Sequence, residues 1–160
     1  MADSEALPGF ILRAKRATYA AQGDDATVTP LLPGSRQLEY REGDWFYRDV
    51  YFGMAGFAGL EIIHEANDPR WSMAYAGGVI AGASRAQMGQ VYAFLRSALQ
   101  RGTLEAPFRG PSRYESFGYE YVNEWRGTVE DFSGAELIRR DGGVVYRLTY
   151  AGGSVRSAPG

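Results

Sequence analysis

The sequence predicts an α+β fold made of two α-β-β-β units, with one antiparallel sheet and two helices packed on one of its faces. The first observation is an internal repeat at an offset of 75 residues, in which Phe57–Ile63 returns as Phe132–Ile138 and Trp71–Val79 returns as Tyr146–Ser154. The second is that short turns separate the expected strands, which is typical of antiparallel sheets. We therefore expect a single domain over residues 1–160 with a pseudo-twofold axis between its repeats.

Repeat one is predicted to span about residues 8–80 and to begin with a helix over 10–22, because Phe10 and Ala14 recur at helical spacing. A long connection over residues 23–39 is expected next, and loops of that length are often functional. Three strands rich in aromatic and β-branched residues then follow, over 44–53, 57–64 and 71–79.

Repeat two is predicted to span about residues 84–155 and to begin with a helix over 85–101. Ser84 and Gln87 have the spacing of a capping box at its start. A loop carrying Arg109 comes next, and Asp141-Gly142-Gly143 predicts a tight hairpin near the end of the repeat. The strands of this repeat are expected over 118–127, 132–140 and 144–151.

Composition narrows the classes of protein to consider. A chain of 160 residues with 45% hydrophobic content can bury a sizeable core. The absence of cysteine and the single histidine, His64, argue against disulfides, thiolate or histidine metal sites and cysteine nucleophiles, so no metal and no cofactor are expected. The net charge of −2 disfavours direct nucleic-acid binding and anionic membranes. No apolar run reaches the ~20 residues of a membrane span, so we expect a cytoplasmic bacterial protein.

Alternate residues of the first strand in each repeat form matching aromatic rows. Period-two alternation places Trp45, Tyr47, Asp49 and Tyr51 on one face, and it places Tyr119, Tyr121, Asn123 and Trp125 on one face in the second repeat. Such rows are more often core than binding surface. An aspartate within an aromatic row is costly to bury without a partner, which favours a binding role for the first row.

The second strands of the two repeats each carry a carboxylate in an apolar row. We expect Glu61 and Glu136 to form ion pairs with Arg36 and Arg113, which hold matching places in the two repeats. The alternative is that Asp49 and Glu61 share a cleft as the acid and base of a hydrolase. Gly59 and Gly134 are predicted to be bulges or points of close approach.

Several distinctive strings carry a family resemblance. They include Ala14-Lys15-x-x-Thr18-Tyr19-Ala20, Gly43-Asp44-x-x-Tyr47-x-Asp49-x-Tyr51, Phe57-x-Gly59-x-Glu61, Trp71-x-Met73-x-Tyr75 and Phe108-Arg109-Gly110-Pro111. Together they resemble an uncharacterised bacterial domain family of unknown function. That family is found alone or fused behind helix-turn-helix regulators of the xenobiotic-response-element type. The resemblance implies a sensor-like context and brings no activity with it. The plan is also similar to two-repeat effector-binding domains, which bind aromatic or cationic compounds between their halves.

The expected function is small-molecule binding in an aromatic and acidic cleft between the repeats, without catalysis. Rings together with a carboxylate suit an organic cation or an amphipathic aromatic ligand. The alternatives are a carboxylate-dependent hydrolase and a homodimer or protein-interaction domain. The predicted ligand-binding residues are Trp45, Tyr47, Asp49, Tyr51, Glu61, Trp71, Tyr75, Lys15 and Arg109.

Overall fold

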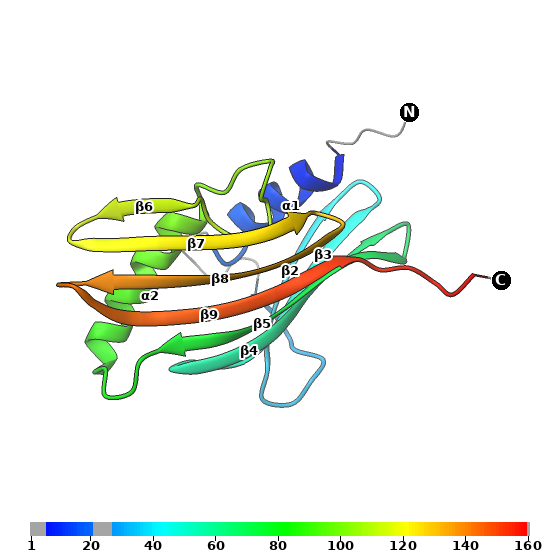
Figure 1. The fold of residues 1–160 in the computed structure, drawn as a ribbon. Coiled ribbons are helices and arrows are strands. Elements are labelled where there is room, and N and C mark those ends of the chain that lie inside the picture. The colour runs from blue at the N-terminus through cyan, green and yellow to red at the C-terminus, as the bar shows by residue number, and fades with distance from the viewer. Residues whose placement is uncertain (1–5, 21–26, 160) are drawn as a thin grey trace.

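The computed structural model describes residues 6–20 and 27–159 (Figure 1). Two helices and nine strands follow one another along the chain. Their bounds are α1 (Ala6–Ala17), β1 (Thr27–Val28), β2 (Arg36–Glu42), β3 (Trp45–Gly53), β4 (Gly56–Glu65), β5 (Asp68–Val79), α2 (Arg85–Leu99), β6 (Arg113–Ser116), β7 (Tyr119–Thr128), β8 (Asp131–Arg140) and β9 (Gly143–Ser154).

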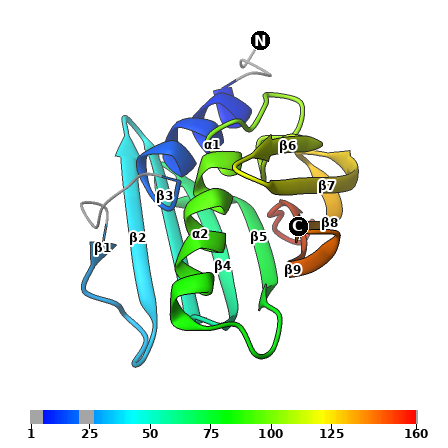
Figure 2. The same cartoon turned by 90° about the vertical axis from the view of Figure 1, so that its left-hand side faces the viewer.

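All nine strands belong to one antiparallel sheet in the order β1-β2-β3-β4-β5-β9-β8-β7-β6. The sheet is strongly curved, and both helices lie on the same side of it, with α2 crossing in front of the β4 and β5 strands (Figure 2). The predicted α+β class, with two helices on one face of an antiparallel sheet, is therefore confirmed. We call β2–β5 the first half of the sheet and β6–β9 the second half.

The two halves meet where β5 pairs with β9. Tyr75 lies opposite Tyr150 in this ladder, and Trp71 lies opposite Ser154. Register positions recur on either side of the junction: Asp49 opposes Glu61 between β3 and β4, and Asn123 opposes Glu136 between β7 and β8. We use the word counterparts for residues that hold the same register position in the two halves.

The inward alternation of the strands supplies the core beneath the helices. The predicted rows on β3 and β7 face the helices, and Tyr47, Asp49, Tyr121 and Asn123 are all buried. Helix α2 begins with the predicted capping box of Ser84 and Gln87. Its buried face is formed by Val91, Phe94, Leu95, Ala98 and Leu99, at the spacing of an amphipathic helix.

Two predicted details differ from the structure. Helix α1 begins at Ala6 and ends at Ala17 instead of running over 10–22; the predicted end at Gln22 lies outside the described residues. Each half contains four strands rather than three, because β2 and β6 occupy segments that we predicted to be loops. Both are edge or near-edge strands that follow loops containing proline, and β6 is only four residues long, so their alternation is weak in the sequence.

The hairpins follow the turn chemistry of the sequence. Asp141 and Gly142 both have positive φ, 50° and 77°, as a two-residue type I′ turn requires. Gly59 and Gly134 are points of close approach: a methyl group on either would lie 2.4 Å from the hydroxyl oxygen of Tyr75 or Tyr150. The bulges lie elsewhere, between Ile63 and His64 and between Ile138 and Arg139.

Candidate functional site

A cavity of about 190 Å³ lies between the first half of the sheet and the helices. Its polar wall comes from Lys15 on α1, Asp49 on β3, Glu61 on β4 and Arg109 in the connection that follows α2. Its aromatic wall comes from Tyr47, Tyr51, Phe57, Tyr75 and Tyr92. The cavity thus joins strands of the first half of the sheet to both helices and to the connection after α2.

Seven of the nine residues predicted for a ligand site line this cavity: Lys15, Tyr47, Asp49, Tyr51, Glu61, Tyr75 and Arg109. The two tryptophans lie elsewhere. Trp71 is fully buried, stacks on Phe132 and donates its indole N–H to the Val129 carbonyl oxygen at 3.0 Å. Trp45 stacks on Phe10, which places it in the core beside α1.

Sequence reasoning missed the part of the wall that comes from helices. Tyr19 follows α1, and Tyr92, Leu95, Arg96 and Leu99 belong to α2. Tyr19 lies within a string that carries the family resemblance, and Tyr92, Leu95 and Leu99 recur at helical spacing within the helix predicted over 85–101. The spacing of the α2 residues is typical of a core face, and only the docking of both helices onto the sheet turns these side chains toward the cavity.

Glu61 has one satisfied and one unsatisfied carboxylate oxygen. Its Oε1 accepts a 2.7 Å ion-paired hydrogen bond from Lys15 Nζ, and both side chains are buried. Its Oε2 is buried and has no hydrogen-bond partner in the described part of the chain. Burial lowers the pKa of Lys15, and the charge of Glu61 opposes that shift. A buried acceptor without a donor is costly, so this oxygen needs an N–H or O–H group from another source.

Asp49 lies beside Glu61 on the same face and is held by a tyrosine. The Tyr75 hydroxyl donates a 2.6 Å hydrogen bond to Asp49 Oδ1. Burial raises the pKa of Asp49 to about 7, and the neighbouring Glu61 charge raises it further, while the Tyr75 hydrogen bond and Lys15 act in the opposite direction. Asp49 therefore exchanges its proton close to neutral pH.

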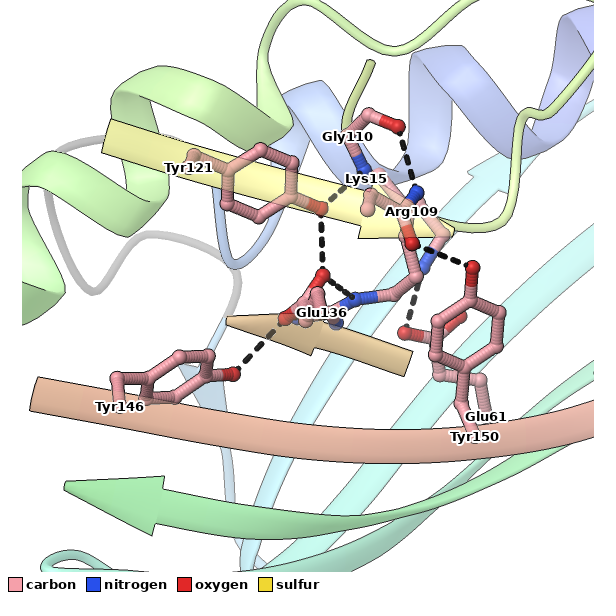
Figure 3. A network of polar contacts seen from close by, with 9 residues as sticks. Lys15, Glu61, Arg109, Gly110, Tyr121, Glu136, Tyr146 and Tyr150 are labelled. Carbon is pink, nitrogen blue, oxygen red and sulfur yellow. Dashed lines mark hydrogen bonds and ion pairs between the residues drawn. The ribbon is translucent and has the colours of Figure 1, made fainter. Parts of the chain in front are cut away.

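The second half holds the corresponding polar groups in a closed network (Figure 3). Arg109 makes a bidentate pair with Glu136, and the Tyr146 hydroxyl donates to Glu136 Oε1 at 2.9 Å. The Tyr121 hydroxyl donates to Glu136 Oε2 and accepts from the Gly110 N–H at 3.1 Å. Both oxygens of Glu136 are thus satisfied by the protein itself.

Asn123, the counterpart of Asp49, also completes this network. Its Oδ1 accepts from the Tyr150 hydroxyl at 2.7 Å, as Asp49 accepts from Tyr75. Its Nδ2 then donates to the Gly110 carbonyl oxygen at 2.9 Å. The side chain therefore both accepts and donates, whereas an ionised aspartate can only accept.

The ring of Phe108 fills the second half where the first half has its cavity. Phe108 is fully buried and stacks on Phe132 with centroids 4.0 Å apart and planes 7° apart. It also contacts Tyr150 and Trp125, with centroid distances of 5.9 and 6.3 Å. Phe132, Tyr150 and Trp125 are the counterparts of three residues of the cavity wall, Phe57, Tyr75 and Tyr51.

The predicted ion pairs of the two glutamates are wrong in their partners. Glu61 pairs with Lys15 and Glu136 with Arg109, not with Arg36 and Arg113. Arg113 instead pairs with Glu115 and Glu120 at the surface, and Arg36 is exposed at the edge of the cavity. Arg36 and Arg113 begin β2 and β6, which were not predicted as strands, and this placement keeps both arginines away from the glutamates.

Fold and site together define an α+β domain with an aromatic and charged cavity on the first half of the sheet and a closed polar network at the corresponding register positions of the second half. The chain belongs to the family described as a domain of unknown function (DUF5680), whose model matches residues 49–155. Neither the curated proteins nor the solved structures yield a match to this chain. Among residues 6–20 and 27–159, no helix has the length and apolar character needed to cross a membrane.

Proposed function

We propose that this chain is a small-molecule-binding, sensor-like module whose ligand occupies the cavity in the first half of the sheet. The observation that carries the proposal is the unsatisfied Glu61 Oε2 on the cavity wall. Natural proteins rarely leave a buried charged acceptor without a donor, and a bound molecule with an N–H or O–H group supplies one.

The likeness of the two halves supports an origin by duplication, after which only one half kept a cavity. In our proposal, β2–β5 and β6–β9 are copies of one unit, related by an approximate twofold axis at the pair of Tyr75 and Tyr150. The matching registers, bulges and tyrosine-to-glycine contacts support this relation. The second copy keeps a closed structural network, and the first copy is open for a ligand.

The cavity limits the size of the ligand. An engineered cavity of about 150 Å³ holds a benzene molecule, so a volume of about 190 Å³ admits a single ring with a short substituent. The wall of tyrosines and Phe57 suits the ring, and Asp49 and Glu61 suit an organic cation or another hydrogen-bond donor. The proposed setting is the bacterial cytoplasm, alone or fused behind a helix-turn-helix regulator.

A thermal-shift screen tests the proposal. Metabolites, nucleosides, sugars and small amines would be added to the purified protein, because ligand at 100 times its Kd stabilises a fold by about 2.7 kcal/mol. We expect one chemical class to raise Tm, and the rise to be reduced in Glu61→Gln relative to the exposed control Asp131→Asn. If no class raises Tm, small-molecule binding is contradicted and an interaction domain becomes the better proposal.

A second candidate function is a carboxylate-dependent hydrolase. Asp49 and Glu61 are directly opposed on one face of the sheet, and the pKa of Asp49, at about 7, suits a general acid near neutral pH. The cavity is too small for more than a single ring, which leaves little space for a substrate and water together. Turnover of the ligand found in the screen, abolished in Asp49→Asn, would favour this alternative over simple binding.

A further inference from the structure

In the second half of the sheet, a loop of the protein itself fills the place that corresponds to the cavity. Three consecutive residues, Phe108, Arg109 and Gly110, provide a ring, a cation and backbone hydrogen-bonding groups to the polar network there. They belong to the connection between α2 and β6. In the first half, where the cavity lies, Lys15 on α1 supplies the cation to Glu61, and the rings of the described residues that pair with Phe57 have centroids 6.0 Å or farther away. The chemical groups that these three residues supply therefore indicate which groups a ligand of the cavity would supply.

The ring position is defined by the stacking of Phe108. Phe132 faces it at 4.0 Å, and Trp125 and Tyr150 border it. Their counterparts Tyr51, Phe57 and Tyr75 all line the cavity. An aromatic ring placed against Phe57 would therefore find the same kind of surroundings that Phe108 has.

The polar groups of the first half differ from those of the second half in the hydrogen-bonding partner that they require. Asn123 donates to a carbonyl oxygen, but its counterpart Asp49 has no donor when ionised. Glu136 receives two guanidinium hydrogen bonds, whereas Glu61 receives one ammonium hydrogen bond and has a free oxygen. Both changes favour a group that donates over a group that accepts.

Counting charges in the buried cluster points the same way. Lys15 neutralises Glu61, and Arg109 neutralises Glu136 through its bidentate pair. The remaining buried carboxylate, Asp49, is hydrogen-bonded to a neutral tyrosine. When Asp49 is ionised, one further positive charge beside it balances this buried cluster.

We infer that the cavity binds a small aromatic ammonium ion, whose ring stacks on Phe57 and whose nitrogen donates to Glu61 Oε2 and Asp49. The inference rests on the proposed function and narrows it to one ligand class. The ring takes the place that corresponds to Phe108, and the ammonium group lies beside Lys15 and supplies the donor that Glu61 Oε2 lacks. The ligand thus completes in the first half the network that the protein completes by itself in the second.

Isothermal titration with matched probes tests this inference. The probes are 2-phenylethylammonium, its neutral analogue 2-phenylethanol, the anion phenylacetate and the non-aromatic cation 2-cyclohexylethylammonium. We expect 2-phenylethylammonium to bind at least tenfold more tightly than the alcohol or the anion. It should bind at least about threefold more tightly than the cyclohexyl cation. In Asp49→Asn the preference over the alcohol should fall to about twofold or less, because Asn123 shows that an amide is tolerated there. The exposed control Asp131→Asn should keep the full preference.

Other results would separate this inference from the proposed function. Equal binding of the alcohol, tighter binding of phenylacetate, or a preference unchanged in Asp49→Asn would overturn the ammonium class while a small-molecule site remained. If no probe binds but the thermal-shift screen finds a ligand of another class, the inference falls and the proposed function stands. If neither experiment finds a ligand, both fall.

Discussion

Glu61 and Glu136 hold the same register position in the two halves of one sheet, yet only Glu136 has both carboxylate oxygens hydrogen-bonded by the protein. The difference has an identifiable source. Glu136 receives hydrogen bonds from Arg109, Tyr121 and Tyr146, whereas among the described residues Glu61 receives one, from Lys15. Trp71, the counterpart of Tyr146, donates to the Val129 carbonyl oxygen instead. The two halves of the sheet therefore differ in how fully the described residues satisfy the buried glutamate.

Replacing Asp49 by Asn should change how stability depends on pH. The folded-state pKa of Asp49 is about 7, above its unfolded value of 3.8, so the folded protein binds more protons than the unfolded chain between these values. Its contribution therefore falls as pH rises from about 4 to 7, by on the order of 4 kcal/mol at most. Wild type should lose stability relative to Asp49→Asn across this window and remain constant relative to it above about pH 8.

Urea unfolding of both proteins at pH 5 and pH 8 measures this difference. The groups that face Asp49 are Glu61 on β4, Tyr75 on β5, Lys15 on α1 and Arg109 after α2, and all are retained in the variant. Equal changes in unfolding free energy for both proteins would show that Asp49 does not retain a proton in the folded state.

The reciprocal change Asn123→Asp should destabilise the protein. The new carboxylate would lose the hydrogen bond to the Gly110 carbonyl and oppose its oxygen in a buried site. We expect a loss of about 1–3 kcal/mol at pH 8, measured by urea unfolding. A neutral effect would mean that the second half accepts an acid as readily as the first and that the two sites are equivalent.

Lys15→Met should be strongly destabilising, because it leaves the buried Glu61 carboxylate without its cation. Removing one partner of a buried pair costs about 3–5 kcal/mol, and the double variant Lys15→Met with Glu61→Gln should recover part of the loss. Arg13→Met provides the exposed comparison, since its pair with Glu42 lies at the surface, where water and salt screen the interaction, and should contribute little to stability. The losses are measured as changes in the free energy of unfolding in urea. Equal losses for Lys15→Met and Arg13→Met would contradict a buried ion pair between Lys15 and Glu61.

Gly59→Ala should disturb the site through Tyr75. The added methyl group would lie 2.4 Å from the tyrosine hydroxyl oxygen, so the ring that holds Asp49 must move, at a cost of about 1–3 kcal/mol. Gly89→Ala is a suitable control, because Gly89 lies in α2 with open space around it, and alanine there should stabilise by about 0.5–1 kcal/mol. Thermal unfolding of both variants would measure the contrast, and a neutral Gly59→Ala would show that the close approach carries no constraint.

The sequence predicted the parts of this account that depend on local pattern. Alternation placed Tyr47 and Asp49 on one face, and Ser84 with Gln87 marked the start of α2. Partner choice could not be predicted in the same way, because Lys15 reaches Glu61 across 46 positions of the chain and only after α1 docks on the sheet. The role of Phe108 was also hidden, since it lies in a loop and the loop predicted before the first strand, over residues 23–39, contains no aromatic residue.

The most direct test of the central claim is a crystal structure of the protein with 2-phenylethylammonium. We expect one molecule in the first-half cavity. Its ring should lie against Phe57, and its nitrogen should lie within hydrogen-bonding distance of Glu61 Oε2 and Asp49. The Phe108 site in the second half should be unchanged. A structure in which Glu61 Oε2 is satisfied by a protein group, with the cavity closed and the ion absent from it, would contradict the claim.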